Sequence, residues 1–176
     1  MFEEYLFDAD YLRKRALENK KTDERIARRY HRLSIFCLFS ALESYINYIT
    51  DIFKDNHKID YSLRLFLNDK KLVFSDTKGL IEKDEYHRVE EKIRLLNIIF
   101  DCKISFNKKE WSDFKNFKQT RDKLVHSRMD EDYTNLNKYE KEIATGLKSI
   151  IYIMNLLSVG IFSKPIRKKI LDIIPD

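Results

Sequence analysis

Glycine and proline are scarce in this sequence, which holds three Gly and two Pro among 176 residues. Turn-rich β folds need both residues at positions with special backbone angles, so this scarcity argues against such a fold. Abundant Lys, Glu, Leu and Ile favour helices instead. With 43% hydrophobic residues, the chain is long enough for one domain with its own core. We therefore expect residues 1–176 to form a single all-α domain, an up-and-down bundle of about five helices.

Cysteine is almost as scarce, and the two that occur, Cys37 and Cys102, lie in apolar surroundings. They show no CxxC pattern and no Cys/His ligand spacing, which predicts reduced, packed thiols in a cytosolic protein. His31, His57 and His87 have no companions at metal-ligand spacing and are interpreted as surface or boundary residues. A Gly-rich phosphate loop and a nucleophile elbow are also missing. We therefore expect no metal and no cofactor.

The sequence also lacks an apolar run that approaches the ~20 residues needed to span a bilayer. Residues 1–5 are acidic and show no charged-then-apolar leader, which predicts no signal peptide. We expect a soluble, cytoplasmic protein with no membrane partner. The formal charge of +5, with 36% charged residues, is a mild excess on a surface dense in both signs. This charge permits nucleic acid as a partner without requiring it.

Apolar residues recur at three- and four-residue steps through most of the chain, the spacing of amphipathic helices. The strongest stripe follows a cap at Thr22 or Asp23 and predicts a long helix to about residue 56, the spine of the bundle. This stripe comprises Ile35, Leu38, Leu42, Ile46, Ile49 and Phe53. The other helices are expected over residues 3–19, 84 to about 101, 110–125 and 143–162.

Residues 57–83 are the least regular part of the chain. They predict, in order, a helical turn over 61–67, a short extended piece over 71–74 and a turn over 75–79. In the helix that follows, we expect Val89, Ile93, Leu96, Ile99 and Phe100 on the buried side and Glu90, Glu91, Lys92 and Arg94 facing outward. The basic segment 163–170 has two interpretations, a solvated terminus or a contact with an RNA backbone.

The segment Thr120–Arg128 combines an always-charged guanidinium, Arg121, with a titratable imidazole, His126. Both residues are expected near the C-terminal end of the helix over 110–125. Positions five apart on an α-helix point about 140° away from each other, so a straight helix does not bring the two onto one face. Either the helix ends or bends near His126, or another surface completes the site. We therefore predict a site shared between two subunits.

Arg121, Asp122 and His126, with four residues between the Arg and the His, resemble the signature of the HEPN superfamily. The segment Ser40–Asn47 resembles a pattern that the family carries on an earlier helix. The resemblance implies an all-helical bundle of about this size that cleaves RNA without a metal as a homodimer. It also implies a place in toxin–antitoxin, abortive-infection or CRISPR-linked defence, with an antitoxin or regulator as a possible partner.

The residue types of this motif suit metal-independent RNA cleavage. His126 can act as general base or acid, and two subunits supply two imidazoles. Arg121 keeps its proton, so its role is to hold the charge that develops on the scissile phosphate. Asp122 orients its neighbours or stands at the dimer seam. Lys123 and Arg128 either contact flanking RNA phosphates or are ordinary solvated cations.

Glu43 interrupts the apolar stripe of the spine helix and has two interpretations. It either faces water at the flank of the helix, or it accepts a hydrogen bond from Arg121 or His126 and holds that residue in place. A subset of the family carries a Tyr two residues after the His, the acceptor for a partner nucleotidyltransferase. This sequence has Arg128 there, and the next tyrosine is Tyr133, so silencing by adenylylation at the motif is not expected.

The sequence therefore predicts a metal-independent endoribonuclease that acts as a homodimer. The alternative is a non-catalytic helical module that binds a nucleotide, RNA or another protein, with Arg121 as a helix-end cation and His126 as a packed histidine. A DNA-binding regulator is disfavoured because no compact helix-turn-helix with a Gly turn is legible.

Overall fold

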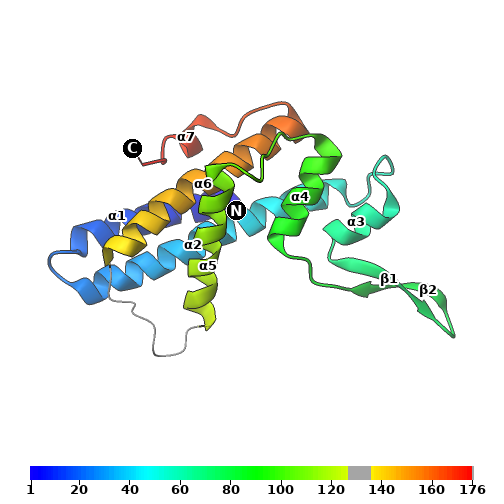
Figure 1. Cartoon of the computed structure of the whole chain (residues 1–176), viewed down its shortest axis with the longest axis horizontal. Coiled ribbons are helices and arrows are strands. Elements are labelled where there is room, and N and C mark those ends of the chain that lie inside the picture. The colour runs from blue at the N-terminus through cyan, green and yellow to red at the C-terminus, as the bar shows by residue number, and fades with distance from the viewer. Residues whose placement is uncertain (127–135, 176) are drawn as a thin grey trace.

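The structure, a computed structural model, describes residues 1–126 and 136–175 (Figure 1). It is mostly helical, which confirms the predicted all-α class, but the described residues form seven helices and one β-hairpin instead of about five helices. In chain order the elements are α1 (Phe2–Asn19), α2 (Glu24–Phe53), α3 (Tyr61–Leu67), β1 (Lys70–Ser75), β2 (Gly79–Asp84), α4 (Val89–Phe100), α5 (Lys109–His126), α6 (Leu136–Phe162) and α7 (Lys168–Leu171).

Three long helices, α1, α2 and α6, lie side by side and enclose most of the core (Figure 1). The 30-residue α2 is the spine that the apolar stripe predicts, and it begins where Asp23 accepts a 3.0 Å hydrogen bond from the Ile26 amide. Five of the six predicted stripe residues are buried to 1% exposure or less, and only Phe53 is half-buried. Burial of a continuous stripe explains why this helix extends so far without a break.

The bundle is not a simple up-and-down arrangement, because α5 crosses α2 and α6 steeply (Figure 1). Trp111, Phe114 and Phe117 form its buried side at helical spacing. The crossing is close at Gly146 of α6, where any Cβ would overlap the Phe117 ring. A glycine inside α6 therefore permits the approach of α5 that positions its C-terminal end.

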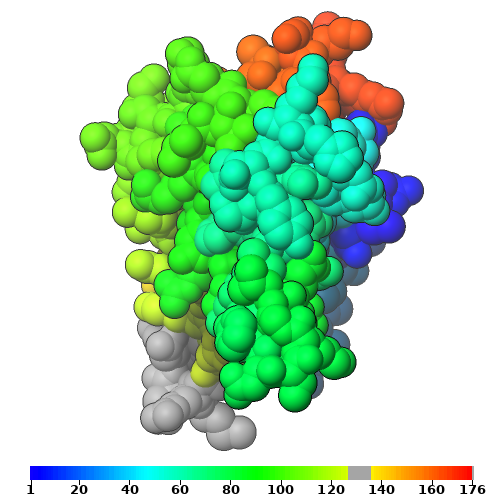
Figure 2. Space-filling view, turned by 90° about the vertical axis from the view of Figure 1, so that its right-hand side faces the viewer, coloured from blue at the N-terminus to red at the C-terminus, as the bar shows by residue number. Residues whose placement is uncertain are grey.

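The irregular stretch contains α3, with the predicted limits, followed by the antiparallel hairpin β1–β2. The extended piece is confirmed in β1, but the second strand was not predicted, and it displaces the start of α4 from residue 84 to Val89. Gly79 follows the turn with a φ of 73°, and Phe74 pairs with Leu80 across the strands. Figure 2 shows the hairpin and α3 covering one end of the molecule.

Two residues are buried that the sequence analysis placed outside. Lys92 of α4, expected to face outward, is 5% exposed and pairs with Asp69 at 2.5 Å. His31 of α2, expected at the surface, is fully buried and stacks on Tyr139 of α6. Neither ring nitrogen of His31 has a hydrogen-bond partner among the described residues, and burial lowers its pKa. A partner on another element and a packed helix crossing are tertiary features that helical periodicity does not encode.

The basic segment near the C-terminus packs its two isoleucines against the bundle and leaves its cations exposed. Ile166 and Ile170 are buried at 7% and 1% exposure, and Arg167 and Lys169 both pair with Glu3 of α1. Two apolar residues thus anchor this segment to the bundle. The interpretation of this segment as a solvated terminus is wrong for Ile166 and Ile170, whereas Arg167 and Lys169 are exposed.

Both cysteines are free thiols, as predicted. Cys102 is buried, and burial raises its pKa to about 11; burial also raises the pKa of the half-buried Cys37.

Two of the described helices, α2 and α6, are long and apolar enough to cross a membrane by length and composition alone. The sequence analysis did not pick them out. In the folded chain 56% of the most apolar window of α2 and 50% of that of α6 are buried.

Candidate functional site

Arg121 lies on the last turns of α5, where α5 crosses α2. Its guanidinium donates a 2.8 Å hydrogen bond to Asp122 and a 3.4 Å hydrogen bond to Glu43 of α2. It also stacks over the Phe39 ring, with the guanidinium carbon 4.0 Å from the ring centroid. Because Phe39 precedes Glu43 by one helical turn, a single face of α2 supplies both the ring and the carboxylate. Arg121 is thus held in a fixed orientation, and its side chain is 23% exposed.

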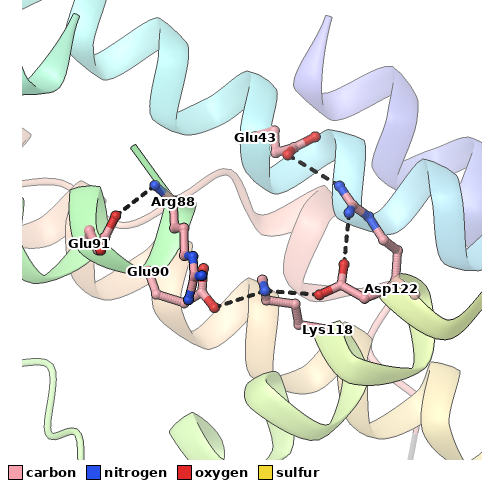
Figure 3. A network of polar contacts seen from close by, with 7 residues as sticks. Glu43, Arg88, Glu90, Glu91, Lys118 and Asp122 are labelled. Atoms are coloured by element: carbon pink, nitrogen blue, oxygen red, sulfur yellow. Dashed lines mark hydrogen bonds and ion pairs between the residues drawn. The ribbon is translucent and has the colours of Figure 1, made fainter. Parts of the chain in front are cut away.

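Asp122 connects this arginine to a second cation. Its other oxygen accepts a 2.9 Å hydrogen bond from Lys118 one turn earlier on α5, and Lys118 also pairs with Glu90 of α4 at 3.2 Å. The alternating charges Glu43, Arg121, Asp122, Lys118 and Glu90 therefore join α2, α5 and α4 (Figure 3). Burial works against the Lys118 ammonium, but the hydrogen bonds to Asp122 and Glu90 outweigh it and raise the pKa of Lys118.

Glu43 follows the second of its two interpretations, because it accepts a hydrogen bond from Arg121. Burial raises the pKa of the Glu43 carboxyl; the Arg121 charge opposes this shift and the Asp122 charge adds to it. The carboxylate is thus a half-buried anion whose nearest compensating charge is the arginine. Removing that arginine would leave Glu43 with an unfavourable negative charge.

His126 is the last residue of α5 and is exposed. It lines, with Arg121, a surface depression of about 360 Å³ whose walls come from α2, α4, α5 and the loop before α4. Arg121 and His126 therefore line one depression although five positions separate them on α5. The remaining lining residues are Phe39, Tyr86, Arg88, Val89, Lys118 and Asp122.

The two predicted RNA-contact cations have different outcomes. Lys123 lies on α5 and is exposed, but it does not line the depression. Arg128 and Tyr133 lie outside the described residues, so their predicted roles are not addressed by the structure.

Several residues of the site were not predicted from the sequence. Lys118 stands four residues before Asp122, the spacing of helical ion pairs, so its pairing was legible. Tyr86 and Arg88 lie in the loop between β2 and α4, and Tyr86 is 79% exposed. Their proximity to α5 depends on the unpredicted second strand. For Tyr86, the one feature of the sequence that could have marked it as a site residue is that a large aromatic stands among charged residues.

The chemical groups around the depression are of the kinds that contact a phosphodiester. Arg121, Arg88 and Lys118 surround the depression with positive charge, the exposed imidazole of His126 offers proton transfer, and the exposed ring of Tyr86 offers a surface for stacking a base. The carboxylates of Glu43 and Asp122 pair with Arg121, and Glu90 pairs with Lys118, so three carboxylates oppose the three cations. The site is therefore polar and preorganised, and its formal charges balance.

No family model matches the chain, and neither a curated protein nor a solved structure matches it.

Proposed function

We propose that this protein is a metal-independent endoribonuclease of the HEPN type, soluble and cytoplasmic, that acts as a homodimer in a toxin–antitoxin or anti-phage defence system. The observation that carries the proposal is that Arg121 and His126 line one depression at the end of α5. The Glu43–Arg121 hydrogen bond supports it further, because a fixed guanidinium binds a phosphate at lower entropic cost than a mobile one.

In the proposed reaction the RNA 2′-oxygen attacks the adjacent phosphorus, and the bond from phosphorus to the 5′-oxygen breaks. One His126 takes the proton from the 2′-hydroxyl as the general base. The products are a 2′,3′-cyclic phosphate and a 5′-hydroxyl. Arg121 stabilises the extra negative charge on the phosphorane, where a preorganised donor has its largest effect.

The 5′-oxygen needs a proton as it leaves, and a single imidazole cannot be base and acid at the same moment. The described residues of the depression include one histidine, His126. A second protomer would supply the second imidazole across a two-fold axis, as isologous dimers do. Tyr86 and Arg88 would then hold the nucleotides beside the scissile bond, the ring by stacking and the guanidinium by a phosphate contact.

The test is cleavage of RNA by purified protein in EDTA, with analysis of the product ends. We expect 2′,3′-cyclic phosphates, and we expect His126→Ala and Arg121→Ala each to slow cleavage by roughly 10²- to 10⁴-fold. His57→Ala is the matched control, because His57 is exposed and lies outside the depression. Equal cleavage by all four proteins would refute the assignment of the site.

A non-catalytic module that binds RNA, a nucleotide or a protein is the second candidate. One observation favours it: two carboxylates already neutralise Arg121, as in a structural ion-pair network. This candidate predicts RNA binding that depends on Arg121 without any product, so the same assay separates the two functions.

A further inference from the structure

Four arginines lie within the first turns of α2, at positions 25, 28, 29 and 32. No acidic residue interrupts residues 25–32, whereas the chain as a whole carries 34 basic and 29 acidic residues. This segment thus carries four of the 34 basic residues and none of the 29 acidic ones. Together with Tyr139 of α6 they line a depression of about 300 Å³.

Their spacing puts two of these arginines, Arg25 and Arg32, on the face of α2 that also supplies Phe39 and Glu43 to the Arg121 site. Arg25, Arg32 and Phe39 are seven residues apart, and seven residues return to the same helical face within about 20°. Glu43 follows Arg25 by 18 residues, which is about five full turns. The arginines thus continue the line of Phe39 and Glu43 toward the N-terminal end of α2, where Arg32 lies about 10 Å and Arg25 about 21 Å from Phe39 along the helix axis.

Three of the four guanidiniums are available for a ligand. Arg28 is half-buried and pairs with Glu24 at 3.0 Å. Arg25, Arg29 and Arg32 are exposed, and none of them pairs with a carboxylate within the part of the chain that the structure describes. Elsewhere the exposed cations of this protein commonly carry an acidic partner, as Arg15 does with Glu18 and Lys54 does with Asp51. Residues 25–32, which contain no acidic residue, therefore differ from the rest of the surface, where basic and acidic side chains are mixed.

We propose that Arg25, Arg29 and Arg32, here called the arginine track, bind the phosphate backbone of a single RNA strand whose scissile link lies at Arg121 and His126. This inference rests on the proposed function and names how the substrate is held. Guanidiniums bind phosphates through planar pairs of hydrogen bonds and carry no base preference at such contacts. The rigid helix fixes the distance from the track to the depression, so a strand in the depression would continue along α2.

The experiment measures binding of a fluorescein-labelled single-stranded RNA of about 16 nucleotides, the upper end of site sizes for single-strand binding folds. All proteins carry His126→Ala so that the RNA stays intact. The triple variant Arg25→Gln, Arg29→Gln and Arg32→Gln is expected to bind about a hundredfold more weakly at about 0.1 M salt. The slope of log affinity against log salt should fall by about two, because each phosphate contact contributes about 0.7.

Two controls isolate position from charge. Lys78→Gln, Lys83→Gln and Lys108→Gln remove the same charge from exposed positions outside both depressions, and this variant should bind within about threefold of the parent. Replacing the three track arginines by lysine keeps the charge but loses the planar pairs of hydrogen bonds, so this variant should bind more tightly than the glutamine triple and more weakly than the parent. Equal weakening by both glutamine triples would overturn the track, since the effect would then be one of net charge.

Further outcomes separate the track from the nuclease. Loss of RNA affinity in the glutamine triple, together with a wild-type protein that never cleaves, would keep the track and refute the endoribonuclease. If a glutamine triple that retains His126 cleaved RNA with an unchanged KM, the endoribonuclease would be kept and the track refuted. Retained RNA affinity, with loss of binding to vesicles of phosphatidylcholine and phosphatidylserine in equal parts, would assign the arginines to a membrane surface and overturn the proposal.

Discussion

Arg121 is held by three contacts and still keeps hydrogen-bond donors that a ligand could use. Its hydrogen bonds to Glu43 and Asp122 use part of its donor set, and Phe39 covers one face. A guanidinium has five N–H donors, so two bonds leave others for a ligand. The same contacts fix its orientation, which a flexible arginine at the end of a helix would lack.

The sequence analysis identified the chemical groups of this site but only part of their environment. Arg121 and His126 were recognisable as a guanidinium and an imidazole in one short motif, and Glu43 because it interrupts an apolar stripe. The cation–π contact of Phe39 was not, because an aromatic within an apolar stripe reads as core. Glu90 could not be found either, since its link to Lys118 depends on how α4 and α5 pack. Pairs within one helix follow from spacing, whereas pairs between helices do not.

His31 carries a prediction at the residue scale. Burial lowers its folded-state pKa below 6.5; Glu140 opposes the shift and Lys20 adds to it. The unfolded chain therefore binds the proton more tightly, so the free energy of unfolding is highest above about pH 6.5 and falls as the pH drops toward the folded-state pKa. We expect a slope of up to about 1.4 kcal/mol per pH unit from this group.

Urea unfolding at a series of pH values measures this slope. His31→Phe keeps an aromatic ring against Tyr139 and removes the titration, so its stability should depend less on pH than that of the wild type. His57→Phe changes an exposed histidine and should leave the slope as it was. Identical slopes for the wild type and His31→Phe would contradict the assignment to His31.

At the scale of elements, a helix end that depends on a local cap was predictable from the sequence. A helix end that depends on strand pairing was not. Asp23 marks the start of α2 because its carboxylate satisfies an amide of the first turn. The start of α4 was misplaced because residues 79–84 contain few turn signals and resemble a helix start. In the structure Glu82 instead pairs across the hairpin with Lys70. The secondary structure of residues 79–84 depends on partners in the other strand, and helical periodicity gives no information about those partners.

The packing of α6 depends on a glycine at its C-terminal end. A Cβ at Gly160 would lie 2.7 Å from the Cα of Cys102, a backbone atom that cannot move aside easily. Alanine normally stabilises a helix interior by up to about 1 kcal/mol relative to glycine. Here we expect Gly160→Ala to lower the free energy of unfolding by roughly 1–3 kcal/mol, the usual cost of overpacking.

Chemical denaturation of Gly160→Ala against the wild type gives that difference. Lys148→Ala is the control on the same helix, because Lys148 is exposed and its replacement should change stability by less than about 0.5 kcal/mol. A Gly160→Ala protein as stable as the wild type would show that the loop around Cys102 shifts without cost.

For the whole molecule, the composition predicted the class of fold, while the path of the chain needed the structure. Three Gly and two Pro correctly excluded a turn-rich β fold. The steep crossing of α5 was not predictable, because it depends on Phe117 meeting Gly146. That crossing sets which face of α2 is adjacent to His126.

The proposed dimer makes a prediction at this scale. If one His126 is the base and the other is the acid, a dimer with one His126→Ala protomer has lost one of them. Mixing and re-equilibrating equal amounts of wild type and His126→Ala should then reduce cleavage to about one quarter of that of the same total amount of wild type, the share of doubly wild-type dimers under random pairing. Product formation under substrate excess measures this fraction.

Mixing wild type with His57→Ala at the same ratio should leave full activity. A fall to one half in the His126→Ala mixture would mean that each protomer works alone, and the shared site would have to be abandoned.

The unbroken length of α2 has one more consequence. The arginine track and Phe39, which lines the Arg121 depression, lie along the same 30-residue helix, so the distance between them changes only if α2 bends. On the proposed function, the protein would bind an RNA strand at the arginine track and cleave it at a fixed distance from the track, at the Arg121 depression. The fragments released from a long transcript would then reflect the spacing between grip and cut as well as the bases at the scissile position.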